Sequence, residues 1–227
     1  MRQKKLRIMA IGAHLDDIEI ACGGTLAKAV DKGHEVKMLV LSKSAYVHYK
    51  GKSIRTENIA VKEARLAASI LGVNDLEILE FPTKDIPYES QVVESINARL
   101  DEFRPNLIIT HWPFDTHKSH QNTALSAIAA GRYYNSIIMF EPFPPGGRSY
   151  VGFRPQLYVD ITIYIDAKIN SIKAHKSEFE KYGGKNWIDA IKARAIFRGF
   201  DLIAPTVKTP KYAEAFEIIR LNIDFLS

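Results

Sequence analysis

The sequence has very little cysteine and no long apolar run, and both absences narrow the class of protein. Cys22 is the one cysteine in 227 residues, so no disulfide can form within the chain and no thiolate cluster can hold a metal. No apolar run reaches the roughly 18 residues of a membrane-spanning helix, and the start of the chain is unlike a cleavable signal peptide. We therefore expect a cytoplasmic protein without a membrane span.

A strong excess of one charge is missing too, as are the common phosphate-binding loops. The net charge is only +5, and neither paired Cys/His spacing nor an RNP-like aromatic run accompanies it, so we predict no nucleic acid partner. Gly23 and Gly24 follow neither the dinucleotide spacing G-x-G-x-x-G nor the Walker spacing. Since glycine has no Cβ, we interpret this pair as a close backbone approach where a helix begins beside a site.

What the sequence does contain is an alternation of apolar runs and segments of helical period. Continuous apolar strands separated by helices indicate a mostly parallel sheet covered on both faces. We expect one α/β, Rossmann-like domain over residues 1–227, and residues 212–220 fit either a strand or a helix. The expected strands are 6–13, 34–42, 76–81, 106–111, 136–141 and 157–163; the expected helices are 23–33, a segment ending at Gly72, 89–103, 119–132, 166–181 and 187–198.

Ionisable residues gather after two of these strands. The stretch "HLDD" at 14–17 follows the first strand, and "THWPFDTHKSH" at 110–120 contains His111, His117 and His120. Ligands of open parallel sheets bind outside the carboxyl ends of the strands, and in common doubly wound orders the first and fourth strands are neighbours. We therefore expect the two loops to meet.

Together the loops offer the ligands of a catalytic zinc, which takes three nitrogen or oxygen atoms from protein and leaves a fourth position for water. His14 and Asp17 are spaced to point at one centre, and either His117 or His120 completes the set. Asp16 is then placed to take a proton from the water. The alternatives are helix capping by "HLDD" and a surface histidine pair in "HKSH". A magnesium phosphotransfer site is disfavoured because it prefers carboxylates to imidazoles.

These residues resemble the PIG-L/LmbE family of zinc-dependent N-deacetylases, which remove acetyl groups from N-acetylglucosamine-type sugars. The resemblance implies one Zn²⁺ per chain held by His14, Asp17 and His120. It also implies Asp16 as general base, and His117 as the group that stabilises the oxyanion or protonates the leaving amine. The matching segments are "AIGAHLDDIEIACGGTLAK", "EARLAASILGV", "DTHKSHQNTALSAI", "YVDIT", "AHKSEF" and "YAEAFEIIR".

Three departures separate this sequence from the family's opening motif A-H-P-D-D-E and its histidine pair. Leu15 replaces the proline, and Ile18 shifts the last acid to Glu19, but neither change removes a ligand. Ser119 stands where the family commonly has an aspartate between the histidines. The imidazolium of His117 is then less stabilised, unless Asp115 or another acid substitutes.

Two irregular segments, 42–55 and 142–155, are expected to form the rim of the site. Aromatic faces suit sugar rings and cations suit phosphate, so we predict substrate contacts for Tyr46, Arg55, Arg148 and Arg154. The hypothesis is a small N-acetylated sugar that carries an anionic group, for instance a nucleotide-linked N-acetyl-hexosamine. The alternative is an ordinary solvated basic loop.

Two other functions fit the same residues. One is a non-catalytic carbohydrate-binding protein of this fold, because the acid between the histidines is missing. The other is a zinc amidase acting on a different acylated amine, since metal residues define the bond broken better than the molecule that carries it. The sequence leaves the oligomeric state open, a homo-oligomer included.

Overall fold

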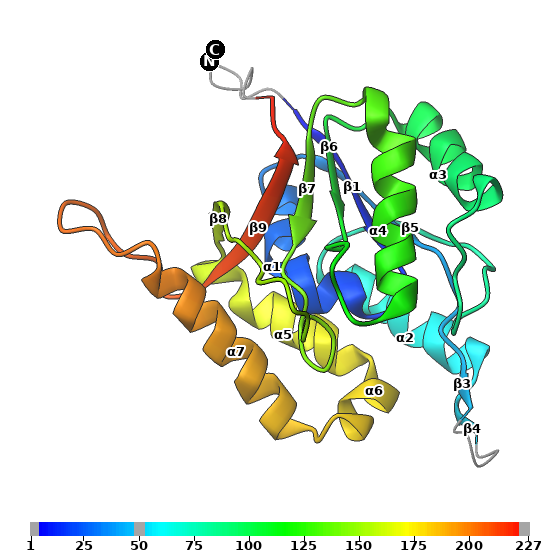
Figure 1. The fold of residues 1–227 in the computed structure, drawn as a ribbon. Helices are drawn as coiled ribbons and strands as arrows, with labels where there is room; N and C mark the ends of the chain where they lie inside the picture. Colours follow the sequence, from blue (N-terminus) through cyan, green and yellow to red (C-terminus); the bar gives the residue numbers. More distant parts are fainter. Residues whose placement is uncertain (1–4, 48–52, 223–227) are drawn as a thin grey trace.

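The computed structural model describes residues 5–47 and 53–222, which fold around a seven-stranded sheet (Figure 1). The strand order is β5-β2-β1-β6-β7-β9-β8. The first five of these run parallel, and β9 is antiparallel to both of its neighbours. The strands are β1 (Arg7–Gly12), β2 (Glu35–Val40), β5 (Asp75–Ile78), β6 (Leu107–Thr110), β7 (Ile137–Phe140), β8 (Leu157–Asp160) and β9 (Ala213–Arg220).

Helices cover both faces of the sheet, as the sequence predicts. The reason is visible in β1, where Ile8 and Ala10 pack into the core beneath α1 and α2, while Met9 and Ile11 pack into the core beneath α3 and α4. A strand buried on both sides must be apolar throughout. The helices are α1 (Asp17–Asp31), α2 (Glu57–Ile70), α3 (Ser90–Phe103), α4 (Lys118–Ala130), α5 (Ile165–Ala174), α6 (Lys176–Lys181) and α7 (Lys185–Phe200).

The strand order places a topological switch point between β1 and β6. From β1 the chain proceeds to β2 on one side, and it later returns to β6 on the other side. The loops that leave the carboxyl ends of β1 and β6 therefore diverge and leave a crevice between them, where ligands of such sheets bind. The fold class expected from the sequence is confirmed.

The structure corrects several element boundaries. Helix α1 begins at Asp17 rather than at residue 23, and the expected helix 166–181 is divided at His175 into α5 and α6. The strand expected at 157–163 ends at Asp160, and a short 3-10 helix, Thr162–Tyr164, follows it. The ambiguous segment 212–220 contains the strand β9, because it pairs on both sides.

Two smaller features lie in segments expected to be irregular or helical. The polar loop 43–54 contributes to a two-stranded sheet of β3 (Tyr46–Val47) and β4 (Ser53–Arg55). A second 3-10 helix, Gly131–Tyr133, extends α4. No helix in the described ranges is long and apolar enough to cross a membrane.

The glycine pair lies within α1 rather than at its start. A Cβ on Gly24 would lie 2.8–2.9 Å from side-chain atoms of Ile161, so the expected close approach exists at this residue. At Gly23 a Cβ would meet only ordinary contacts at 3.6 Å.

Candidate active site

A cleft of about 330 Å³ opens at the carboxyl ends of β1 and β6, at the switch point of the sheet. The two loops meet there as predicted, since the backbone N–H of Ala13 donates to His111 Nε2 at 3.0 Å. The ionisable side chains that these two loops contribute to its lining are His14, Asp16, Asp17, His111, His117 and His120.

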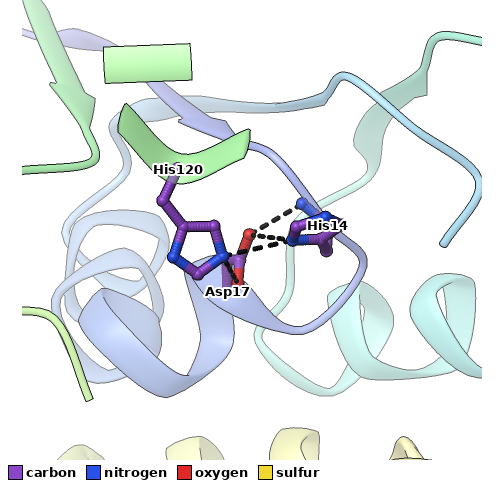
Figure 2. A group of neighbouring side chains, drawn as sticks. All are labelled: His14, Asp17 and His120. Carbon is purple, nitrogen blue, oxygen red and sulfur yellow. Dashed lines mark hydrogen bonds and ion pairs between the residues drawn. The ribbon is translucent and has the colours of Figure 1, made fainter. Parts of the chain in front are cut away.

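His14, Asp17 and His120 point toward one another (Figure 2), and one potential ligand atom from each lies within 4.8 Å of the others. His14 Nδ1 is 3.2 Å from His120 Nε2 and 3.4 Å from Asp17 Oδ2, and His120 Nε2 is 3.3 Å from Asp17 Oδ1. The structure thus brings His120 into the cluster with His14 and Asp17. His117 stacks on the outer side of the His120 ring at 4.4 Å between centroids.

Hydrogen bonds on the far side of each imidazole set its tautomer. His14 Nε2 lies 3.0 Å from the carbonyl oxygen of Thr83, and His120 Nδ1 lies 3.0 Å from Asp115 Oδ2. Each of these acceptors takes one ring N–H, so His14 Nδ1 and His120 Nε2 are the ring nitrogens that face the carboxylate of Asp17. A cation at this point, either a proton on His120 or a metal ion in its place, stabilises the arrangement.

The electrostatics of the cluster favour a positive charge at this point. Burial lowers the pKa of His120, but the carboxylates of Asp17 and Asp115 outweigh it and raise the pKa to about 10. Burial raises the pKa of Asp17, yet the neighbouring His120, His111 and His14 hold it well below its usual range.

The donor set fits a divalent metal ion. A tetrahedral zinc site with bonds of about 2.0–2.1 Å separates its donor atoms by about 3.3–3.4 Å. Here His14 Nδ1 lies 3.2 Å from His120 Nε2, and these two nitrogens lie 3.4 and 3.3 Å from Asp17 Oδ2 and Oδ1, respectively. The three side chains are only 11–16% exposed, on the wall of a cleft that leaves room for a further ligand.

Asp16 lines the same cleft next to the cluster but is not one of its three members. Burial, then the charges of Asp17 and Glu178, raise the pKa of its carboxyl to about 7. A carboxyl with this pKa exchanges a proton readily near neutral pH, as a general base must.

The ring of His117 has a different environment from the one that the family motif implies. Burial, followed by the charges of His120 and His14, lowers its pKa to about 4, so the ring is neutral near pH 7. Ser119, which stands where the family commonly has an aspartate, bonds to the backbone: its Oγ accepts the N–H of Ile86 and donates to the carbonyl of Thr83. Asp115 accepts the backbone N–H of His117 through Oδ1 and bonds the ring of His120 through Oδ2. In the described ranges no hydrogen bond joins the His117 ring to a carboxylate.

His111 was singled out in the sequence but given no role, and the structure places it behind Asp17. Its Nε2 accepts the N–H of Ala13 and lies 3.1 Å from Asp17 Oδ2. Burial and His120 lower the pKa of His111 to about 4, so the ring packs against Asp17 in its neutral form.

Of the four predicted substrate contacts, Tyr46 and Arg55 line the cleft. The guanidinium of Arg55 is almost wholly buried and is engaged by Glu63, Glu178, His175 Nδ1 and the carbonyl of Leu15, while its Nε has no partner among the described residues. Arg148 and Arg154 are not in the lining: Arg148 is exposed, and Arg154 pairs with Glu217 at 2.9 Å.

The sequence did not point to the aromatic wall of the cleft. Tyr182 and Trp187 line it with ring centroids 5.2 Å apart, and Lys181 Nζ lies 4.8 Å from the ring centre of Tyr46 and 4.6 Å from that of Tyr182. Tyr46 was expected at the rim from the sequence, but Tyr182 follows α6 and Trp187 lies in α7, far along the chain from the other cleft residues. No local spacing could therefore have placed Tyr182 and Trp187 in the cleft.

Comparisons with known proteins identify the family and relatives of this chain. Residues 9–130 match the family described as PIG-L: GlcNAc-PI de-N-acetylase. The chain is 25% identical to diacetylchitobiose deacetylase of Thermococcus kodakarensis over 208 residues, which are 85% of this chain and 78% of that protein. It is 24% identical to a probable N-acetyl-α-D-glucosaminyl L-malate deacetylase 2 of Bacillus cereus over 184 residues, 76% of this chain and 84% of that protein.

The fold is also found in an enzyme of different chemistry. The crystal structure of the 4-carboxy-2-hydroxymuconate hydratase GalB from Pseudomonas putida superposes with a TM-score of 0.78 at 19% identity, covering 96% of this chain and 98% of that one. At this identity the likeness concerns the fold alone. Because the family match covers more than half of the sequence, the chain belongs to the PIG-L family.

Proposed function

We propose that this protein is a zinc-dependent deacetylase that hydrolyses the acetamido group of an N-acetyl-hexosamine-type sugar. The observation that carries the proposal is the convergence of His14, Asp17 and His120 on one point, with Asp16 beside them in the same cleft. Diacetylchitobiose and N-acetyl-glucosaminyl-malate deacetylases are among its relatives, which supports an N-acetylated sugar as substrate.

His14, Asp17 and His120 would hold the zinc ion, which when bound supplies Lewis-acid polarisation of the amide carbonyl and lowers the pKa of water. Asp16 accepts a proton from the water whose oxygen attacks the acetyl carbon. It then returns this proton to the sugar nitrogen as the C–N bond breaks, so that acetate and an amine leave. A neutral His117 donates its ring N–H to the carbonyl oxygen as negative charge develops there.

The cleft supports a small substrate. Its volume of about 330 Å³ is near the lower end of the range for small-molecule sites, about 300–1,000 Å³. Tyr46, Tyr182 and Trp187 offer aromatic faces for a sugar ring. Lys84 and Lys181 also line the cleft and favour a substrate with an anionic substituent over a neutral one.

Acetate release tests the proposal. The purified full chain would be assayed on N-acetylglucosamine, diacetylchitobiose and N-acetylglucosamine derivatives with a carboxylate or phosphate group. We expect acetate release that a chelator abolishes and added Zn²⁺ restores. Metal binding without turnover of any N-acetyl sugar would contradict the deacetylase assignment and favour a carbohydrate-binding protein. Turnover restricted to acylated amines that are not sugars would favour the amidase alternative.

A further inference from the structure

Helix α1 is bent five residues after Asp17. Cys22 has φ −138° and ψ 19°, outside the helical region, so α1 consists of a short first segment, Asp17–Ala21, and a longer second one. The first segment carries one member of the proposed metal site. The direction of this segment therefore decides where the Asp17 carboxylate points.

Lys168 of α5 binds the backbone carbonyls on one side of the bend. Its Nζ donates to the carbonyl of Glu19 at 3.2 Å and to that of Ile20 at 2.7 Å. Its third bond goes to Glu214 Oε1 at 2.5 Å, so all three ammonium hydrogens have acceptors.

Glu214 of β9 binds the backbone amides on the other side of the bend. Oε1 accepts the N–H of Gly24 at 3.0 Å, and Oε2 accepts the N–H of Thr25 at 2.7 Å. In a straight helix the Gly24 N–H would bond the Ile20 carbonyl. Here the Gly24 N–H bonds to Glu214 and the Ile20 carbonyl bonds to Lys168.

The charges also match the two helical segments. The ammonium of Lys168 lies at the carboxyl end of the first segment, and the carboxylate of Glu214 lies at the amino end of the second, so each complements the local helix dipole. The side chains of Lys168 and Glu214 are only 2% and 4% exposed, and this burial strengthens the ion pair between them. The cavity beside them measures about 10 Å³ and is too small for a substrate.

We propose that Lys168 and Glu214 are positioning residues that hold the bend in α1 and so aim Asp17 at His14 and His120. The proposal rests on the metal site of the proposed function. A second contact supports it from the same helix, since His175 at the end of α5 bonds Glu19 Oε1 at 3.1 Å. Both Lys168 and Glu214 lie outside the segment that matches the family, residues 9–130.

Co²⁺ binding to the full chain tests this proposal. The variants are Lys168→Met and Glu214→Gln, and Lys173→Met, an exposed lysine of the same helix, is the matched control. We expect a Co²⁺ Kd at least about tenfold weaker in both variants, as found when groups that orient metal ligands are removed, with an altered Co²⁺ absorption spectrum. Lys173→Met should retain both wild-type properties.

The outcome distinguishes positioning from a purely structural role. A folded Lys168→Met or Glu214→Gln protein with a lowered melting temperature, but with the wild-type Kd and spectrum, would overturn the proposal. Glu214→Gln retains volume and one acceptor, so it provides the test if Lys168→Met does not fold. A wild-type chain that binds no Co²⁺ would instead contradict the proposed function.

Discussion

Asp115 Oδ2 lies 3.0 Å from His120 Nδ1, on the side of the imidazole opposite to Asp17. From the sequence, Asp115 was a candidate to replace the acid missing at position 119 and to orient His117. The structure places its carboxylate on the ring of His120 instead. It thereby supports the side chain that completes the proposed metal site, and it leaves the ring of His117 without its help.

Asp115→Asn should weaken metal binding. The amide no longer offers a charged acceptor to His120 Nδ1, and loss of such outer partners typically costs about 10–100-fold in metal affinity. A competition titration with a chromophoric chelator would measure the Kd. Asp85→Asn, at a surface carboxylate that pairs with Lys118, should bind like the wild type. Equal metal affinities for Asp115→Asn and wild type would show that Asp115 does not support the metal site through His120.

Asp16→Asn should abolish most of the activity while leaving the metal bound. General base catalysis contributes about 10²–10⁴-fold, so we expect kcat to fall by that factor. Metal content and acetate release, measured on one preparation, would separate the two effects. In the contrasting variant, Asp17→Asn, the metal content and the rate of acetate release should both decline because a proposed ligand is lost. A near-normal kcat in Asp16→Asn would exclude it as the base.

Tyr182→Ala should raise KM and change kcat little. An aromatic contact that binds ground state and transition state equally contributes only to KM, and such contacts are worth about 0.5–1.5 kcal/mol, about twofold to tenfold in binding. Tyr150→Ala, at a ring that is 96% exposed, is the control. Steady-state kinetics on an N-acetyl sugar would give both constants, and an unchanged KM would mean that the wall does not contact the sugar.

Arg154→Ala tests a substrate contact that was expected from the sequence. Since the guanidinium pairs with Glu217 and does not line the cleft, we expect KM for anionic and neutral sugars alike to remain at the wild-type value. A selective rise in KM for the anionic sugar would return Arg154 to the binding site. Lys181→Met removes a cation that does line the cleft, so this comparison variant should raise KM for the anionic sugar.

Gly24→Ala should destabilise the fold. Its new Cβ would lie 2.8–2.9 Å from the buried side chain of Ile161, and overpacking of this kind costs about 1–3 kcal/mol. Denaturant unfolding would measure the loss. Gly152→Ala, where a Cβ would meet nothing within 4 Å, should show no such cost. Equal stabilities would mean that Ile161 yields to the added methyl group.

Much of the architecture follows from local pattern. The apolar runs at 6–13, 34–42 and 106–111 became β1, β2 and β6, because a strand buried on both faces must be apolar throughout. The meeting of the two ionisable loops was also predictable, since parallel strands end at the same edge of a sheet. The start of α1 was missed because residues 17–20, Asp-Ile-Glu-Ile, alternate between polar and apolar with the period of a strand rather than that of a helix.

The sequence by itself determined the residue types of the site and the edge of the sheet where they gather, because strand periodicity and chain direction are local properties. Residue spacing alone left His117 and His120 as alternatives, the family resemblance implied His120, and the tertiary structure brings His120 together with His14 and Asp17. Only the tertiary structure decided that Asp115 supports His120 and that Arg154 faces Glu217. It also paired Lys168 with Glu214 across the bend of α1. Contacts between distant side chains depend on how helices and strands pack, and no spacing along the chain encodes that packing.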